Sequence, residues 1–275
     1  MYIKFWGCRG GIPVSGEKYL FYGGETTCVE IRDQKGNLII IDGGSGIRNL
    51  GKKILLEEKF DINMIFTHVH WDHIIGLPFF SPLYDKRFKI NIFGDNELQE
   101  NIFEHIFLIF SAPFFPVNSE ELSAEFNFIP IKKETKIGDI NLKTISLSHP
   151  NGGIGLKFYD NDKSFVFLTD NELGFVHRGG KEFEEYVEFC KNADLLVHDA
   201  EYTEEEHKKK IGWGHSSIDD VIRLAIDSKV NAVGFFHHNQ DHSDEDLKKM
   251  ENYAKKKLKG KVESFVVFEK QEIVL

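Results

Sequence analysis

The sequence predicts an α/β protein of the α+β type, in which two β-sheets pack together and helices cover their outer faces. Early strand-like runs follow one another as in hairpins, and later strand-like runs alternate with helical patterns. This order of elements is typical of packed sheets with outer helices. Side chains that suit metal ions follow several of the runs, which predicts that loops from both halves meet along one edge. We expect one domain, residues 1–275, built from two halves of about 1–125 and 126–275.

Short runs of apolar and β-branched residues, bounded by turn residues, predict the strands. These runs are Tyr2–Trp6, Cys28–Arg32, Leu38–Ile41, Ile62–Phe66, Lys89–Phe93, Phe126–Ile131, Leu142–Leu147, Ile154–Phe158, Ser164–Leu168, Leu195–Val197, Ala232–Phe236 and Ser264–Phe268.

Two helices begin at recognisable N-terminal signals. Ser217 with Asp220 predicts a capping box, in which the hydroxyl and the carboxylate satisfy free N–H groups of the first turn. Ser243 with Asp246 predicts a second capping box, and the apolar residues that follow it lie on one helical face.

The composition predicts a globular protein and disfavours a nucleic-acid partner. Of the 275 residues 41% are hydrophobic, and the formal net charge is −10 at pH 7. Lys and Arg drive most phosphate-backbone binding, so this acidic balance argues against broad nucleic-acid affinity. Cys8, Cys28 and Cys190 show no zinc or redox spacing, so we expect a reducing cytoplasm. No apolar run approaches the length that spans a membrane.

The segment THVHWDH, residues 67–73, carries three histidines and one aspartate within six positions. It follows the apolar run Ile62–Phe66, which is typical of a buried strand that enters a loop. Extended backbone projects His68 and His70 to the same side, and a turn places Asp72 and His73 beside them. Imidazole and carboxylate together suit zinc, manganese or iron, so we interpret this segment as a metal site.

Further residues of the same kind follow later strands. His149 follows the run that ends at Leu147, Asp170 follows the run that ends at Leu168, and His237 and His238 follow the run that ends at Phe236. Each is a weak signal alone, because a lone histidine or aspartate at a strand end is more often structural. Together they supply enough ligands for two ions.

The motif His-x-His-x-Asp-His, followed by distant His, Asp and His, resembles the signature of the metallo-β-lactamase superfamily. The segments GCRGGIP (7–13), YGGETT (22–27) and IDGGSG (41–46) resemble its phosphodiesterase branch, which includes ribonuclease Z and cyclic phosphodiesterases. The resemblance covers nearly the whole chain. It implies a four-layer αββα sandwich with the metals at one edge.

By position, the resemblance implies two divalent metal ions, most simply Zn²⁺, with Mn²⁺ and Fe²⁺ as alternatives. The expected ligands are His68, His70 and His149 for the first ion, Asp72, His73 and His237 for the second, and Asp170 as a bridge between them. His237 directly follows the apolar strand, and His238 stays open as the alternative. Asp42 resembles the aspartate that orients a ligand in the family, and a structural turn role is equally open.

This ligand set implies attack by a metal-bridging hydroxide, because two ions about 3.5–4 Å apart lower the pKa of a shared water. We expect Asp72 to orient that nucleophile. The leaving oxygen needs a proton, and His215 in GWGHSS (212–217) resembles the Gly-His-Ser-Thr element of the ribonuclease Z branch. Asp199 in HDAE (198–201) is expected to keep His215 protonated. A structural role for His215 stays open, and for His198 it is the preferred interpretation.

The resemblance therefore implies a hydrolase for a small phosphodiester, most simply a cyclic nucleotide or a cyclic phosphosugar. One alternative is tRNA 3′-end processing, as in ribonuclease Z, whose tRNA-binding arm lies between the positions that match His149 and Asp170. Here those positions are 21 apart, which is enough for a hairpin. The other alternative is a redox or non-phosphodiester hydrolase member of the fold. The redox relatives carry a carboxylate where this chain has His70. A homodimer is expected by resemblance only.

Other side chains have several open roles. The aromatic stretch Phe107–Pro116 can cover the metal edge, stack on a base, pair with a second subunit or, most frequently for such stretches, pack in the core. Three arginines are candidate phosphate contacts, Arg9, Arg48 and Arg178. Three histidines without a supporting pattern are expected at the surface, His105, His177 and His207.

Overall fold

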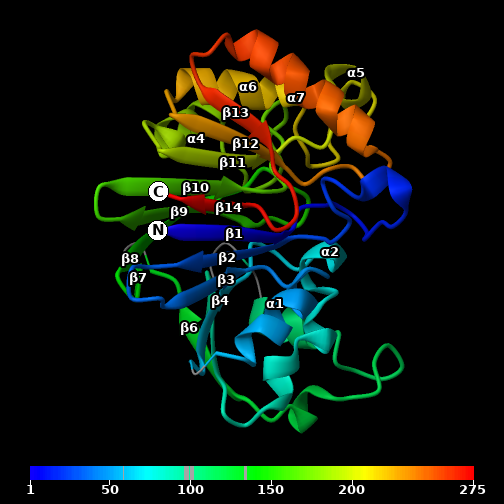
Figure 1. Ribbon diagram of the computed structural model, residues 1–275, viewed down its shortest axis with the longest axis vertical. Coiled ribbons are helices and arrows are strands. Elements are labelled where there is room, and N and C mark those ends of the chain that lie inside the picture. The colour runs from blue at the N-terminus through cyan, green and yellow to red at the C-terminus, as the bar shows by residue number, and fades with distance from the viewer. Residues whose placement is uncertain (58, 96–98, 100–101, 133–134) are drawn as a thin grey trace.

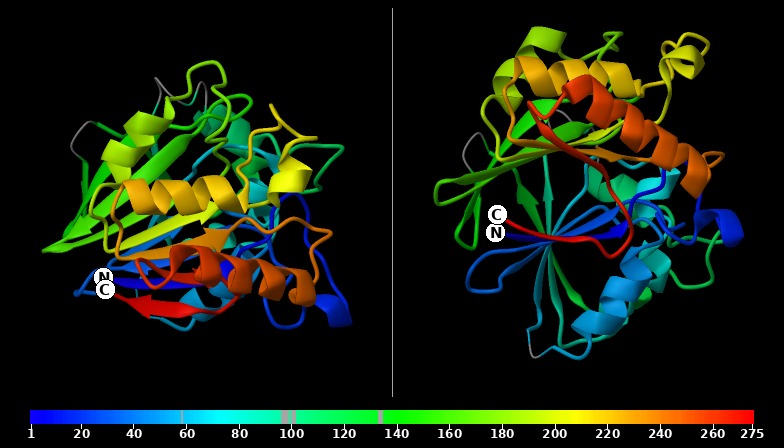
Figure 2. Two further views of the ribbon diagram at one scale, coloured as in Figure 1. Left: turned by 90° about the horizontal axis from the view of Figure 1, so that it is seen from above. Right: turned by 45° about the horizontal axis from the view of Figure 1, so that its top comes forward.

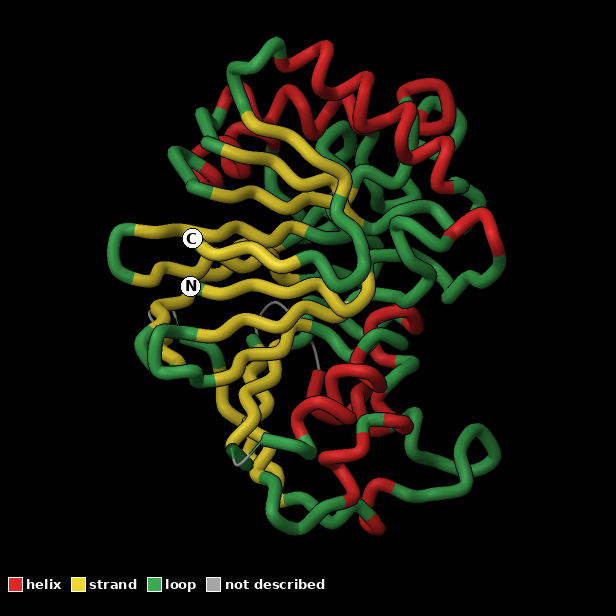
Figure 3. The backbone as a smooth tube through the Cα atoms, viewed as in Figure 1, coloured by secondary structure: helices red, strands yellow, loops and turns green. Residues whose placement is uncertain are grey.

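Two β-sheets stack face to face in the middle of the molecule, and helices cover both outer faces (Figure 1). The structure is a computed structural model that describes residues 1–57, 59–95, 99, 102–132 and 135–275. Figure 3 shows the layers in the order helix, strand, strand and helix. The predicted four-layer sandwich is confirmed.

The first sheet is built from the first half of the chain and from the C-terminus. In spatial order its described strands are β14 (Glu272–Val274), β1 (Tyr2–Gly7), β2 (Cys28–Arg32), β3 (Leu38–Ile41), β4 (Asp61–Ile65), β5 (Lys89–Gly94) and β6 (Glu125–Pro130). Pairing is antiparallel from β14 to β3 and parallel from β3 to β6. Strand β3 reads Leu-Ile-Ile-Ile and is buried throughout, as expected of a strand that is covered on both faces.

The second sheet repeats this pattern with later strands. In spatial order its described strands are β13 (Glu263–Val266), β12 (Ala232–Phe236), β11 (Leu195–Asp199), β10 (Lys163–Leu168), β9 (Ile154–Asp160), β8 (Ile140–Ser146) and β7 (Thr135–Ile137). Pairing is antiparallel from β7 to β10 and parallel from β10 to β13. The two sheets thus divide the chain between β6 and β7, and β14 returns to the first sheet.

The helices form the outer layers. Those packed on the first sheet are α1 (Ile47–Ile54), α2 (Trp71–Ile74) and α3 (Ile102–Phe107), and those packed on the second are α4 (Phe183–Cys190), α6 (Ile218–Asp227) and α7 (Asp244–Leu258). The short helix α5 (Glu204–His207) and the 3₁₀ turns η1 (Glu17–Tyr19), η2 (Leu77–Phe79), η3 (Ser81–Tyr84) and η4 (Ser119–Glu121) lie in connections. Figure 2 shows α6 and α7 side by side over the second sheet. Among these described helices, none combines the length and the apolar character needed to cross a membrane.

Three apolar cores hold the four layers together, one between each pair of neighbouring layers. In the central core, between the sheets, the ring of Phe167 on β10 lies 5.2 Å from that of Phe236 on β12, and Phe236 lies 5.9 Å from Phe5 on β1 (centroid distances). Contacts of this kind fix the two sheets against each other. The strand ends of one sheet are thereby held at a fixed position relative to the strand ends of the other.

Each strand-like run of the sequence overlaps an observed strand, with ends that differ by one or two residues in several cases, and both capping boxes are confirmed. The side chains of Ser217 and Ser243 accept hydrogen bonds from the backbone N–H groups of Asp220 and Asp246. The strands β7 and β14 were not predicted, because each has three residues and little apolar character. Strand β14 pairs with β1, which brings the two chain ends together (Figure 1).

We predict that Phe167→Ala lowers the free energy of unfolding by about 3–5 kcal/mol, because it removes a fully buried ring between the sheets. The measurement is chemical denaturation. The matched control is Phe114→Ala, whose side chain is 79% exposed and whose loss should change stability by about 0.5 kcal/mol or less. Equal effects of the two changes would contradict the assigned central core.

Candidate metal centre

All of the predicted ligands lie at one edge of the sandwich, where strands from both sheets end. The segment 68–73 follows β4, His149 follows β8, Asp170 follows β10 and His237 follows β12. The carboxyl ends of parallel strands meet at the same edge of a sheet. Figure 3 shows long loops gathered at the end of the sandwich that lies away from the two termini.

Three residues of this edge hold a left-handed backbone. The φ angles are 59° at Asp42, 54° at Asp170 and 54° at His237. Non-glycine residues rarely adopt this conformation, and they keep it only where the surroundings impose it. Asp42 and His237 directly follow β3 and β12, and Asp170 lies two residues after the end of β10, so each strained turn directs a polar side chain across the edge instead of along the strand.

Asp170 stands between two groups of side chains, and its two oxygens face different groups. Oδ2 lies 3.5 Å from His68 Nε2 and 3.7 Å from His149 Nε2. Oδ1 lies 3.2 Å from His73 Nε2 and 3.3 Å from His237 Nε2. This is the geometry required of a carboxylate shared by two cations.

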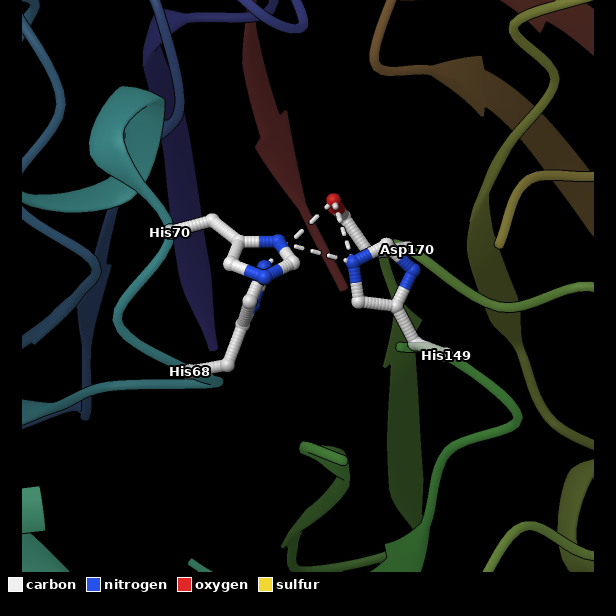
Figure 4. Close-up of side chains that lie close together, drawn as sticks. All are labelled: His68, His70, His149 and Asp170. Carbon is white, nitrogen blue, oxygen red and sulfur yellow. Dashed lines mark hydrogen bonds and ion pairs between the residues drawn. The ribbon is translucent and has the colours of Figure 1, made fainter. Parts of the chain in front are cut away.

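The first group is His68, His70, His149 and Asp170, which point toward a common point (Figure 4). His70 Nδ1 lies only 2.9 Å from His149 Nε2. The second group is Asp72, His73, Asp170 and His237. Within it, Asp72 Oδ2 lies 3.0 Å from His237 Nε2 and 3.4 Å from His73 Nε2.

The donor atoms fit divalent cations. The Nε2 atoms of His68 and His73 are buried and have no hydrogen-bond partner among the described residues. Burial lowers the pKa of His68 and lowers that of His149 to about 4, so both imidazoles are neutral and can act as ligands. Burial alone would raise the pKa of Asp170, but His237 and the other histidines lower it well below its usual range.

The second group carries protons that a cation would replace. Burial opposes the charged form of His73 and His237, but the carboxylates around them raise the pKa of each well above its usual value. Metal ligation requires the neutral imidazole, so a bound cation would take over the role of these protons. Two groups that share Asp170 can therefore hold two ions.

Asp42 orients one of these histidines. Asp42 Oδ2 lies 2.8 Å from His73 Nδ1 and accepts a hydrogen bond from the hydroxyl of Thr67, while Asp42 Oδ1 accepts one from the backbone N–H of Thr67. The ring of His73 is therefore fixed with Nε2 toward Asp72 and Asp170. This contact favours the orienting role over a turn role alone.

The structure places His237, and not His238, against the carboxylates. His238 Nε2 lies 2.7 Å from the carbonyl oxygen of Val267, on the far side of the loop. His237 fits closely against the N-terminal loop, because a Cβ added at Gly10 would lie 2.2 Å from its ring. The backbone N–H of Gly11 donates to Asp72 Oδ2 at 2.9 Å, so the first glycine segment also positions a ligand.

His215 lies beside the second group, between two carboxylates. Its Nδ1 is 3.6 Å from Asp199 Oδ2, and its Nε2 is 3.4 Å from Glu201 Oε2. Burial alone would lower the pKa of His215, but Glu201 and Asp199 raise it to about 9. The predicted Asp199 contact is present, though Asp199 is also fixed by the backbone N–H groups of Asn171 and Ser216.

Sequence reasoning missed Glu201. Its Oε2 also lies 3.3 Å from His237 Nδ1, and its Oε1 accepts a hydrogen bond from the Asn239 side chain at 2.8 Å. Glu201 thus contacts both His215 and His237 from the side away from Asp170. The sequence signal for Glu201 was its position two residues after Asp199. Strand β11 ends at Asp199, so both side chains can reach the same edge.

Two further positions considered in the sequence, His198 and Arg9, are buried and have structural contacts. His198 is buried and contacts Asn171 Nδ2 at 3.1 Å, which supports a structural role. Arg9 is also fully buried, and its guanidinium donates to the carbonyl oxygens of Gly23, Asn239 and His242, so it holds loops and not phosphate.

The expected surface position of His207 is wrong. His207 is buried and lies 3.2 Å from Glu172 Oε1, and His177 lies 2.9 Å from Glu172 Oε2. Glu172 also accepts from the N–H groups of Gly212 and Gly214, so it ties together the loops that flank His215. A buried carboxylate with several donors explains why histidines in a charged segment lie inside the protein.

Two cavities open onto the metal centre. The larger has a volume of about 1300 Å³, and its lining includes the three histidines of the first group, His68, His70 and His149. The smaller has a volume of about 290 Å³, and its lining includes Asp72, Asp170, Glu201, Lys210, His215 and His237. His70 borders both, so the two cavities meet over the ligands.

Comparison with known proteins gives a family and a fold. Residues 37–238 match the family model described as a beta-lactamase superfamily domain. A curated relative, ribonuclease Z of Staphylococcus epidermidis, is 24% identical over an alignment that covers 84% of this chain and 86% of the relative. Among solved structures, the metallo-beta-lactamase fold protein YhfI from Bacillus subtilis is similar with a TM-score of 0.72 at 15% identity, covering 99% of this chain and 98% of that one. A diphosphatase of the PhnP family is similar with a TM-score of 0.70 at 16% identity, covering 100% and 97%.

We predict that Asp42→Ala lowers the affinity for Zn²⁺ by about 10–100-fold, because His73 loses the partner that orients it. Chelator competition measures this affinity. The control is Asp33→Ala. Asp33 is a buried aspartate that directly follows β2 and is not one of the candidate ligands, so its loss should leave the affinity unchanged. An Asp42→Ala protein with unaltered affinity would assign Asp42 to the turn alone.

Proposed function

The chain belongs to the beta-lactamase superfamily, and on that premise we propose that it is a metal-dependent hydrolase of a small phosphodiester. The observation that carries this proposal is the shared carboxylate of Asp170, with histidine nitrogens of one group near Oδ2 and of the other near Oδ1. In this proposal Asp170 and the histidines of the two groups would hold two divalent ions, most simply Zn²⁺. Two such ions supply electrostatic stabilisation of a phosphodiester under attack and lower the pKa of a shared water.

The chain's own residues would position the reacting groups. Asp72 lines the smaller pocket and is held by the N–H of Gly11, so it is placed to orient the attacking water as well as to bind metal. His215 lines the same pocket. With its pKa raised by Glu201 and Asp199 to about 9, it carries a proton at neutral pH and can donate it to the leaving oxygen.

The region between His149 and Asp170 favours a small substrate. It forms only a turn and the hairpin of β9 and β10, and both strands are paired within the second sheet. A protruding arm of the kind that binds tRNA in ribonuclease Z has no residues here from which to form. The net charge of −10 also disfavours a polyanionic partner.

The second candidate function is tRNA 3′-end processing. The similarity to a curated ribonuclease Z, at 24% identity over most of both chains, favours it. A cyclic nucleotide or cyclic phosphosugar is our first choice of substrate, because the described segment between His149 and Asp170 forms only a turn and the β9–β10 hairpin. If no phosphodiester is cleaved, the remaining alternatives are a redox reaction or the hydrolysis of another kind of bond.

We predict turnover of a small cyclic phosphodiester by the metal-reconstituted protein. The assay compares 3′,5′- and 2′,3′-cyclic nucleotides, a phosphoribosyl cyclic phosphate and precursor tRNA. Asp170→Ala should abolish turnover, whereas Asp33→Ala should retain it. Cleavage of precursor tRNA alone would favour the second candidate, and no cleavage of any phosphodiester by protein that holds two metals would overturn the proposal.

We predict that His215→Ala lowers kcat by about 10²–10⁴-fold for diesters with an alkoxide leaving group. The loss should be much smaller for p-nitrophenyl esters, because p-nitrophenolate leaves without a proton. Equal losses for both kinds of ester would assign His215 a structural role.

A further inference from the structure

The larger cavity has an apolar wall beside the first ligand group. Trp71, Leu108 and Phe114 all line it, and their side chains are 54%, 61% and 79% exposed. Large apolar side chains that gather at one place on the surface generally mark a binding site. Because His68 and His70 line the same cavity, this wall faces the metal centre directly.

The aromatic stretch Phe107–Pro116 divides into a buried part and an exposed part. Ile109 and Phe110 are buried in the core between the first sheet and its helices, and Phe115 packs against that core. Leu108 and Phe114 point outward and line the cavity. The buried members thus anchor the stretch, and the exposed members form a surface over the site.

The lining of the cavity also includes polar groups and a cation. Arg178 lines it and is exposed, and no carboxylate lies within ion-pair distance of Arg178 in the described part of the chain. Asn151 also lines it, 3.2 Å from His70 Nε2. A ligand in this cavity can therefore meet both apolar side chains and a guanidinium without a carboxylate partner among the described residues.

The two cavities differ in the group that they suit. His215, the proposed proton donor, lines only the smaller pocket, so the leaving alcohol belongs there. Hydrolysis adds the hydroxyl of water to phosphorus and breaks the bond from phosphorus to the leaving oxygen. That oxygen gains a proton from His215, and the proton that water gives up restores His215. The part of the substrate that extends away from the leaving oxygen then lies toward the larger cavity.

We propose that the larger cavity binds the part of the diester that extends away from the leaving oxygen, and that this part carries a planar aromatic ring, as in a nucleobase or an aryl ester. The ring would pack on Trp71, Leu108 and Phe114, because aromatic rings bury a large area against such side chains. Arg178 would take an anionic oxygen of the same ligand. This inference rests on the proposed function, and it specifies the substrate class of the same site.

The test uses two chromogenic diesters with one leaving group, p-nitrophenyl phenyl phosphate and p-nitrophenyl methyl phosphate, on the metal-loaded full chain. The phenyl ester is intrinsically more reactive, so the quantity of interest is how the ratio of their kcat/KM values changes between proteins. In Leu108→Ser/Phe114→Ser this ratio should fall about tenfold, since the ring loses its apolar surface. Leu56→Ser, which removes an 88% exposed leucine outside both cavities, should leave it unchanged.

Binding of phenyl phosphate and methyl phosphate, measured by calorimetry, gives a second readout. We expect phenyl phosphate to bind about tenfold more tightly, and the double variant to lose this preference. Turnover with an unchanged ratio, or equal binding of the two monoesters, would overturn the inference and leave the proposed function intact. Absence of turnover with a retained binding preference would overturn the proposed function while supporting the aromatic site.

Discussion

The shared, buried carboxylate of Asp170 is the constraint on which the rest of the site depends. A carboxylate taken out of water needs strong compensation, and here histidines of both groups supply it. Their geometry in turn requires that strands from two different sheets end at one edge. The central core of Phe5, Phe167 and Phe236 fixes those sheets against each other, and the left-handed turns at Asp42, Asp170 and His237 aim the side chains inward.

Local patterns made much of this predictable. The apolar runs predicted strands because such runs are buried in a sheet. The two Ser–Asp pairs predicted helix N-termini because their contacts lie only three residues apart. The segment THVHWDH predicted the site because its candidate ligands are neighbours in sequence. Features that depend on distant contacts were not predictable. Glu201, which follows β11, contacts His237, which follows β12. His207 is buried, where its ring contacts the buried carboxylate of Glu172. The short edge strand β14 forms only because β1 offers it a partner.

The two cavities at the metal centre differ in the side chains that line them. The smaller pocket brings together Asp72, His215 and Glu201, which under the proposed function would hold water and move a proton. The larger cavity adds Trp71, Leu108 and Phe114 to the ligand histidines His68, His70 and His149. Under the same proposal, these apolar side chains would select the substrate, and changes at Leu108 or Phe114 would leave the ligands in place.

The most direct test of the shared carboxylate is electron paramagnetic resonance of the protein loaded with Mn²⁺. Two ions bridged by Asp170 should give the broad spectrum of an exchange-coupled pair at two ions per chain. Asp170→Ala should lose that coupling, while Asp33→Ala keeps it. A single isolated six-line signal in the unaltered protein at full loading would contradict a bridged pair and with it the proposed chemistry.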